Sequence, residues 1–247
     1  MVPLKTCQEI DKMQEAGHIL KEVMQELAGL IQPGIASRQL DAASIAAMTR
    51  FGVRSAFKGY RGYPGNICIS VNEEVVHGIP GKRKLEEGDI VGVDIGIELD
   101  GFFVDMAETF PVGRVSAEKQ KLIEVARASL DEAIKAFKPG NMLSDISFAV
   151  QHCVETNGFS VVRDFVGHGI GRELHEEPQI PNFVSKDKGP MLKDGMVFAI
   201  EPMINAGGWE VEVLKDGWTA VTKDRRPSAH VEHTVALVNG AAKILTQ

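Results

Sequence analysis

The sequence predicts an α+β fold made of two related halves, each with two helices followed by strands, around one antiparallel sheet. The first observation is that apolar residues at helical spacing form a pair of helices twice along the chain. Each time the first helix of the pair ends at Pro-Gly, in IQPG at 31–34 and in FKPG at 137–140, and these motifs lie 106 residues apart.

The second observation is a repeat in the strand segments. LEEGDIVGVD at 85–94 aligns with LKDGMVFAIE at 192–201 at an offset of 107 residues, so that Asp94 falls on Glu201. A repeat this long is not a solenoid period and indicates a duplicated unit with one pseudo-symmetric core. We therefore expect a single domain, with no flexible linker between its halves. The expected domain is 1–247, with halves of about 1–110 and 111–247.

The helices of the first half follow from apolar spacing and capping residues. Residues 5–31 form an amphipathic pattern that stops at Pro33-Gly34. Ser37 is a suitable N-cap for the next helix, which ends at Gly52.

The helices of the second half repeat this order. The first begins at about Ser116 and stops at Pro139-Gly140. The next runs from about Ser144 to Thr156 and is closed by Gly158.

A β-hairpin is predicted in GVDIGIELDGFFVDMAETF, because strict alternation flanks Asp100-Gly101, a dipeptide that suits a tight turn. A two-residue turn there makes Asp94 and Asp105 diagonal neighbours on one face, about 7–8 Å apart at the backbone. The other face is apolar and is expected to be core. Two interpretations of the polar face stay open: it faces water, or its carboxylates bind a cation.

Composition limits the class of protein. The net charge of −7 argues against general binding to nucleic acid or anionic membranes. GKRK at 81–84 is interpreted as a solvated turn, with a contact to ribosomal RNA as the minor alternative. The charged start and the lack of a long apolar run predict a cytoplasmic protein that does not contact a membrane or specific DNA.

The three cysteines are far apart and are expected to be reduced. We also expect a monomer.

Two further carboxylates are candidate ligands. Glu201 interrupts the apolar run MVFAIEPMI, where an unpaired buried carboxylate costs several kcal/mol. Glu232 interrupts AHVEHTVALV, and for this residue a water-facing strand position is the competing interpretation.

The seven histidines offer few nitrogen ligands. His77 ends a strand before Gly-Ile-Pro, where a side chain can point into a cleft. In GHGIGRELHEEP, a glycine-lined loop is expected to hold His168 against a ligand, with His175 seven residues later. A nucleotide-binding loop is rejected here, because the motif lacks a full G-x-G-x-x-G and a phosphate-binding lysine. Structural roles are expected for the remaining histidines, which include His18, His152, His230 and His233.

Together, four carboxylates and one imidazole form a set of mostly hard oxygen donors with one borderline nitrogen. Such a set suits a pair of divalent cations such as Mn, Fe, Co or Zn. The aspartates of the hairpin are then expected to be ligands. The expected set is Asp94, Asp105, His168, Glu201 and Glu232.

The order and spacing of these residues, with GHGIGRELHEEP, IEPM and VEHT, strongly resemble the methionine aminopeptidases over essentially the whole chain. The resemblance implies the duplicated pita-bread fold of the creatinase and aminopeptidase type, and removal of the initiator methionine from nascent polypeptides. Because 32 residues separate His168 from Glu201, and because no N-terminal extension is expected, the chain looks like the short bacterial first type.

The resemblance also implies residue roles. Asp105 and Glu232 would bridge the two cations, and Glu201 would also act as general base. His77 and His175 would hold the scissile amide and its tetrahedral intermediate. Four residues match the family's thioether pocket: Tyr60, Tyr63, Cys68 and Trp218.

Three residues depart from the usual family pattern, namely Met106, Arg61 and Leu174. They affect the expected pocket shape and the tolerance for the second residue, but they leave the expected ligands intact. Two alternative functions are a proline-specific peptidase of the same fold, which usually carries a large N-terminal domain, and a metal-free binding protein, which would have lost ligands.

Overall fold

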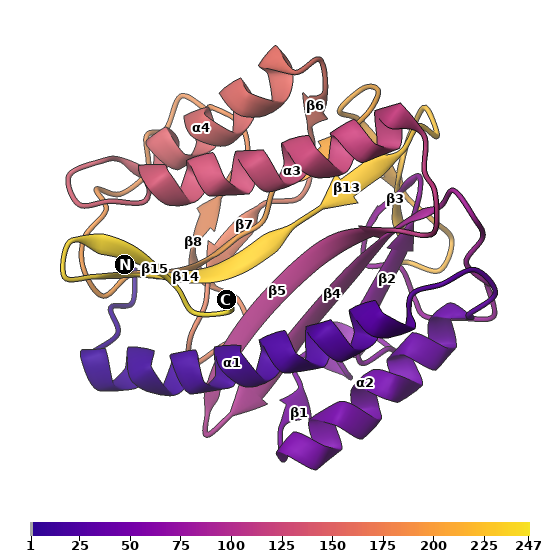
Figure 1. Cartoon of the computed structure of the whole chain (residues 1–247). Helices are drawn as coiled ribbons and strands as arrows, with labels where there is room; N and C mark the ends of the chain where they lie inside the picture. Colours follow the sequence, from indigo (N-terminus) through magenta and orange to yellow (C-terminus); the bar gives the residue numbers. More distant parts are fainter. Residues whose placement is uncertain (1) are drawn as a thin grey trace.

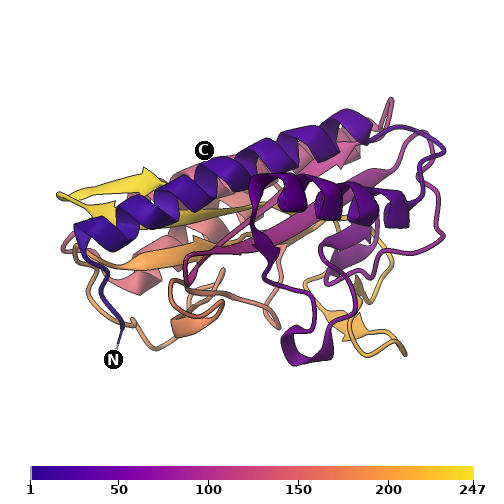
Figure 2. The ribbon, with the colours of Figure 1, turned by 90° about the horizontal axis from the view of Figure 1, so that it is seen from below.

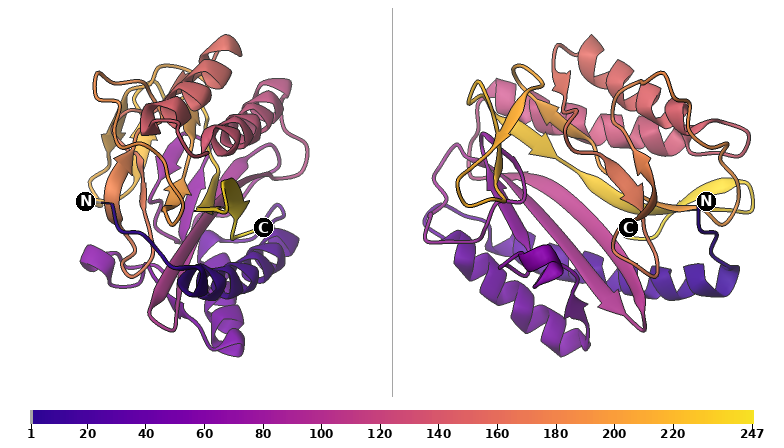
Figure 3. Two further views of the ribbon diagram at one scale, coloured as in Figure 1. Left: turned by 90° about the vertical axis from the view of Figure 1, so that its left-hand side faces the viewer. Right: turned by 180° about the vertical axis from the view of Figure 1, so that it is seen from behind.

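The computed structural model describes residues 2–247, which form four α-helices on one side of a curved antiparallel sheet (Figures 1 and 2). The view from behind places the strands in front of the helices (Figure 3). The helices are α1 Cys7–Leu30, α2 Ser37–Phe51, α3 Ala117–Ala136 and α4 Leu143–Thr156, with the 3-10 turn η1 Tyr60–Gly62. Within these residues no helix is long and apolar enough to cross a membrane.

The strands divide into one large sheet and two small ones. The nine-stranded sheet has the order β1-β4-β5-β14-β9-β7-β8, with β2 beside β4 and β15 beside β14. Its strands are β1 Arg54–Ser55, β2 Cys68–Val71, β4 Ile90–Leu99, β5 Phe102–Pro111, β7 Gly167–Gly169, β8 Glu176–Ile180, β9 Val197–Ile200, β14 Glu232–Val238 and β15 Ala241–Ile244. The small sheets contain β3 Glu74–Val76, β6 Ser160–Val161, β10 Met203–Asn205, β11 Val211–Val213, β12 Ala220–Thr222 and β13 Ser228–His230.

The predicted duplication is visible in the backbone contacts. The isolated bridge between Ala36 and Lys84 recurs between Met142 and Met191, displaced by 106 and 107 residues. The helices that follow these bridges begin in the same way. The N–H of the N-cap residue donates to a side chain three residues later, from Ala36 to Gln39 in α2 and from Met142 to Asp145 in α4. The two halves therefore share local structure as well as sequence.

The helices have the predicted amphipathic character. The predicted apolar positions of α1 are buried against β4 and β5, and α3 and α4 pack on each other and cover a second apolar cluster. One detail of the prediction is wrong: the N-cap of α2 is Ala36, not Ser37. The carboxamide of Gln39 already accepts the N–H of Ala36, and the Ser37 hydroxyl bonds instead to Gly81.

The GHGIG segment also differs from the prediction. It is not a loop around a ligand, because Gly167–Gly169 is strand β7, paired with β8 and β9. A Cβ atom on Gly167 would lie 2.5 Å from the carbonyl oxygen of Ala199. These glycines therefore allow close strand packing, which holds His168 in a fixed position.

Two threonines connect the halves where the central backbone ladder is short. Strands β5 and β14 pair at only two positions, Ala107 with Glu232 and Met106 with His233. Beyond them, Thr234 Oγ1 donates to the carbonyl of Asp105 (2.8 Å) and accepts from its N–H (2.9 Å). Thr109 Oγ1 makes the equivalent pair of bonds with the backbone of His230, at 2.7 and 3.0 Å.

We predict that Thr234→Val lowers the free energy of unfolding by about 2–4 kcal/mol. Valine has the same shape but leaves the buried N–H and C=O of Asp105 without partners, at about 1–3 kcal/mol each. Urea denaturation measures the loss, and Thr109→Val is expected to cause a similar one. The exposed Thr49→Val variant is the control. A loss below 1 kcal/mol in both buried variants would contradict this account of the junction.

Candidate metal centre and active site

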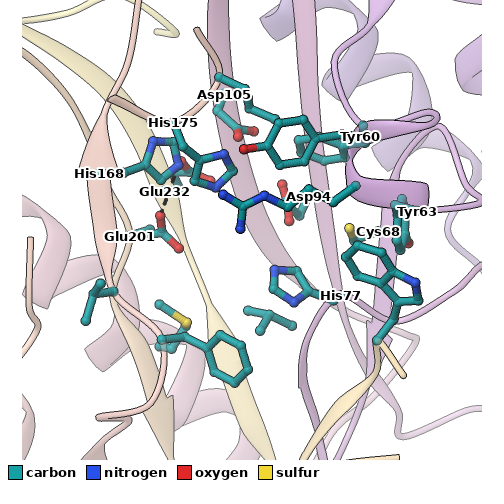
Figure 4. A pocket seen from close by; sticks show the side chains of 18 residues that line it. Tyr60, Tyr63, Cys68, His77, Asp94, Asp105, His168, His175, Glu201 and Glu232 are labelled. Carbon is teal, nitrogen blue, oxygen red and sulfur yellow. Dashed lines mark ion pairs between the residues drawn. The ribbon is translucent and has the colours of Figure 1, made fainter. Parts of the chain in front are cut away.

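One cavity of about 180 Å³ lies where the two halves meet, and all five predicted ligands line it. Asp94 comes from β4 and Asp105 from β5. Glu201 follows β9 directly, and Glu232 begins β14. Figure 4 shows these four carboxyl groups and His168 around one space.

The hairpin register places the aspartates as predicted. Asp94 pairs with Ala107 and Gly96 pairs with Asp105, so that the two aspartates are diagonal neighbours. Ala107 in turn pairs with Glu232 across the junction, which brings a carboxylate of the second half beside them. At Asp105 the polar face of the hairpin does not face water, since Asp105 is only 4% exposed and Glu232, on the neighbouring strand, is only 2% exposed.

The carboxyl groups lack partners within the protein. Among residues 2–247, Oδ1 of Asp94, Oδ1 of Asp105 and Oε1 of Glu232 are buried and accept no hydrogen bond. Buried polar atoms are nearly always paired, so each orphaned oxygen indicates a missing partner. Asp105, His168 and Glu232 offer ligand atoms that all lie within 4.8 Å of one another. Hard oxygen donors with one imidazole fit a divalent cation at this position.

Burial raises the pKa of every carboxyl group in the cluster, and repulsion by neighbouring carboxylates adds to the rise for Asp94, Glu201 and Glu232. For Asp105, burial raises the pKa to about 7. For Asp94, burial and then the charge of Asp105 raise the pKa well above its usual value. Glu201 and Glu232 have raised pKa values for the same reasons. Without a cation, the cluster therefore keeps protons at neutral pH.

His168 is oriented as a ligand would be. Its Nδ1 lies 2.9 Å from the carbonyl oxygen of Gly169, which can only accept, so Nδ1 carries the proton and Nε2 is free. Nε2 is 3.5 Å from Oε1 of Glu201. Burial lowers the pKa of His168 to about 4, so the ring is neutral at pH 7.

His175 and His77 stand on either side of the carboxyl cluster (Figure 4). The ring of His175 lies 4.0 Å from that of His168 and stacks on Tyr60 at 5.1 Å. Burial, followed by His168 and Arg61, lowers the pKa of His175 to about 3. His77 has a left-handed backbone, with φ of 60°, and burial lowers its pKa.

A buried ion pair fixes the turn that carries His175. The Lys5 ammonium binds Glu176, and their side chains are only 4% and 8% exposed. The other oxygen of Glu176 accepts the N–H of Arg172 at 2.7 Å. The side chain of Lys5 lies directly over Gly171, where a Cβ atom would collide with it. The N-terminal segment thus supports the turn next to the cavity.

Aromatic and sulfur side chains form the opposite end of the cavity. Tyr63 packs edge-on against Trp218, with ring centroids 5.1 Å apart, and its hydroxyl bonds to the carbonyl of Gly78 at 2.9 Å. Cys68 is buried beside Asp94, and burial raises the pKa of its thiol. Of the four predicted pocket residues, Tyr63, Cys68 and Trp218 therefore lie together, whereas Tyr60 lies at the His175 end of the cavity.

Sequence reasoning missed His230. Its buried Nε2 has no hydrogen-bond partner among residues 2–247 and lies 3.8 Å from Oε2 of Glu201. Burial lowers its pKa to about 3. Its position in the sequence could have indicated this location. In an extended chain, a residue two positions before Glu232 lies on the same side as Glu232.

A duplicated α+β fold with a buried cluster of carboxylates and imidazole at the junction of its halves defines a metal-dependent enzyme class. The chain belongs to metallopeptidase family M24, whose model matches residues 11–239. This finding confirms the family and the pita-bread fold expected from the sequence.

Three proteins illustrate the similarity. The chain is 49% identical to methionine aminopeptidase 1 of Bacillus subtilis over 100% of both chains. It is 42% identical to methionine aminopeptidase of Escherichia coli, over 99% of this chain and 94% of that one. The crystal structure of methionine aminopeptidase from Thermotoga maritima superposes with a TM-score of 0.97 at 46% identity, covering 100% of both chains.

A prolidase has the same fold. Prolidase from Pyrococcus furiosus superposes with a TM-score of 0.80 at 24% identity, and the match covers 99% of this chain but 65% of the prolidase.

We predict that the metal-free protein loses stability as the pH rises from 6.5 to 8. Raised carboxyl pKa values mean that the folded state holds protons which the unfolded chain has already lost, so the free energy of unfolding falls by roughly 1 kcal/mol per pH unit for each such group. The five histidines whose pKa values are lowered act in the opposite direction, but their effect fades within the lower part of this range, because an unfolded histidine loses its proton near pH 6.5. Urea denaturation in chelator at both pH values measures the change.

Saturating Mn²⁺ is the control for this experiment, because bound cations hold the carboxylates ionised and should remove the decrease in the free energy of unfolding. Glu232→Gln removes one titrating group and should make this decrease smaller. A metal-free protein that is equally stable, or more stable, at pH 8 would contradict the assignment.

Proposed function

We propose that this chain removes the N-terminal methionine from nascent proteins and peptides, with preference for a small second residue. The observation that carries the proposal is that a single cavity joins the carboxyl cluster to the aromatic and thiol end. A thioether side chain fits there, since sulfur against aromatic rings contributes about 0.3–1.5 kcal/mol per contact. Relatives that are 42–49% identical over nearly their full length carry the name methionine aminopeptidase.

Two divalent cations would occupy the carboxyl cluster, with Asp105 and Glu232 shared between them. Asp94, His168 and Glu201 would complete the set, and Co, Mn, Fe and Zn all suit these donors. When bound, such a pair lowers the pKa of water and polarises a carbonyl group. The orphaned oxygens of Asp94, Asp105 and Glu232 support this assignment.

Glu201 is the proposed general base. Its carboxylate lies beside the cluster, next to the neutral ring of His168 and within 3.8 Å of His230. An ionised carboxylate at this position can accept the proton of the attacking water and pass it to the leaving amine. Burial raises the pKa of Glu201, and bound cations would favour its ionised form.

His77 and His175 are the proposed hydrogen-bond donors to the reacting amide. Both rings are neutral at pH 7, so each has one N–H to donate. A preorganised donor aimed at the oxygen on which charge develops lowers the barrier without adding a charge to the cavity. Stacking of Tyr60 on His175 fixes one of these rings and limits the room for the residue after methionine.

We also propose that residues 1–247 act as one monomeric catalytic domain in the cytoplasm. The nine-stranded sheet draws strands from both halves, which supports a single domain. A transient ribosome contact through residues 81–84 stays a prediction. In that run Arg83 is paired with Glu74, which leaves Lys82 and Lys84 exposed for such a contact.

The proposal predicts release of methionine from Met-Ala-Ser but not of the first residue from an Xaa-Pro peptide. Turnover should require added Mn²⁺ or Co²⁺ and should stop in chelator, since the cluster has no other source of positive charge sufficient to offset four carboxylates. Liquid chromatography of the products measures both reactions. Faster cleavage of the Xaa-Pro peptide would favour a prolidase, and turnover that survives chelation would refute metal dependence.

Two variants separate the proposed roles. Glu201→Gln should keep the fold and lower kcat by about 10²–10⁴-fold, because it removes the base. His175→Ala should lower kcat by about 10²–10³-fold while the metal content stays unchanged. Glu98→Gln, on β4 but outside the cavity, is the matched control. Undiminished turnover in Glu201→Gln, or equal losses of metal and activity in His175→Ala, would reverse these assignments.

A further inference from the structure

The cavity opens into an outer groove at the end opposite the thioether pocket. Four residues line both spaces, namely Arg61, Val166, His168 and His175. Figure 4 shows His168 and His175 across the cavity from Tyr63 and Cys68. A peptide whose first side chain enters the thioether pocket therefore leaves past His175 and Arg61. This inference rests on the proposed function.

The backbone of Arg61 is held in an unusual conformation at this outlet. With φ of 48° and ψ of 21°, it occupies the left-handed region, which a residue with a side chain disfavours. Gly59 and Gly62 on either side also have positive φ, at 83° and 91°. Such conformations persist where the surrounding structure imposes them and often mark functional positions. His77 is another residue of the cavity with this feature.

The guanidinium of Arg61 lies near the reacting end of the cavity. Its Cζ atom is 5.4 Å from the ring centroid of Tyr60, and that ring stacks on His175. The positive charge also contributes to the lowered pKa of His175, after burial and His168. Arg61 is therefore within electrostatic range of the bond that the proposed reaction cleaves.

In the part of the chain that the structure describes, no carboxylate pairs with this charge. Among the ion pairs formed by residues 2–247, none includes Arg61. The other arginine of the groove, Arg172, is paired with Glu9. A cation held at the outlet of an active site without a partner is available to a ligand.

We propose that Arg61 is a specificity-determining residue that binds an acidic side chain at the third position of the substrate. The planar guanidinium suits a carboxylate, to which it can donate two parallel hydrogen bonds. Only the third residue of the substrate, which lies next to Arg61, is expected to favour an acidic side chain. Glu173 and Glu177 also line the groove and repel an anion that lies beside them. Glu176, a third acid of the groove, is neutralised by Lys5.

The test compares kcat/KM for three peptides that differ only in the third residue: Met-Ala-Glu-Gly-amide, Met-Ala-Gln-Gly-amide and Met-Ala-Lys-Gly-amide. The terminal amide ensures that only the third side chain carries the varied charge. With the Mn²⁺-loaded enzyme at low salt, we expect the Glu peptide to exceed the Gln peptide by about two- to fivefold, the size of an exposed ion pair. The Lys peptide should be cleaved least, and 0.5 M NaCl should reduce the differences.

Three variants assign the preference to this side chain. Arg61→Gln should abolish the preference for Glu, Arg61→Lys should retain part of it, and Arg61→Glu should favour the Lys peptide. The matched control is Arg172→Gln, which removes a paired charge from the same groove and should keep the preference. Equal cleavage of the three peptides by the native enzyme, or a preference that persists in Arg61→Gln, would overturn the inference while leaving the proposed function intact. No cleavage of any of these peptides would overturn both.

Discussion

Four carboxyl groups buried in one cavity are the constraint on which the rest of the structure depends. Their repulsion and desolvation oppose folding. Among residues 2–247, no group donates a hydrogen bond to the orphaned oxygens and no lysine or arginine forms an ion pair with the cluster. The nearby histidines are kept neutral by burial and cannot offset the charge. Divalent cations resolve this conflict, and the same cations supply the chemistry that peptide hydrolysis requires.

The duplicated fold explains how distant acids reach one place. Each half supplies two carboxylates, Asp94 and Asp105 from the first and Glu201 and Glu232 from the second. The halves meet through a short backbone ladder that Thr109 and Thr234 extend. The hydroxyl of Thr234 accepts from the backbone N–H of Asp105 and donates to its carbonyl oxygen. Fold stability and ligand position are thus set by the same hydrogen bonds, while the surrounding loops, including η1 with Arg61, are free to determine substrate preference.

The sequence predicts the helices from their apolar spacing and the hairpin register from a two-residue turn and a period-two pattern. It predicts the convergence of the candidate ligands from the repeat that aligns Asp94 with Glu201. It does not predict contacts between segments whose pairing is set by tertiary structure. Lys5 pairs with Glu176, which lies 171 residues later in the sequence. His230 lies beside Glu201 although the two residues belong to different strand segments. Strand β7 could not be recognised from the sequence, because its glycines leave no alternation of apolar and polar side chains. Their lack of side chains instead allows close strand packing. The predicted Ser37 cap is wrong because the helix already includes Ser37, whose hydroxyl bonds to the backbone of Gly81.

The most direct test of the central claim is the number of protons released when the metal-free protein binds Mn²⁺ at pH 7. Calorimetric titration in buffers of different ionisation enthalpy measures this number together with the stoichiometry. Because burial raises the carboxyl pKa values, the account predicts two cations bound with release of at least one proton, and loss of this release in Glu232→Gln. Binding without proton release, or no binding, would contradict the claim that cations replace protons on a buried carboxyl cluster.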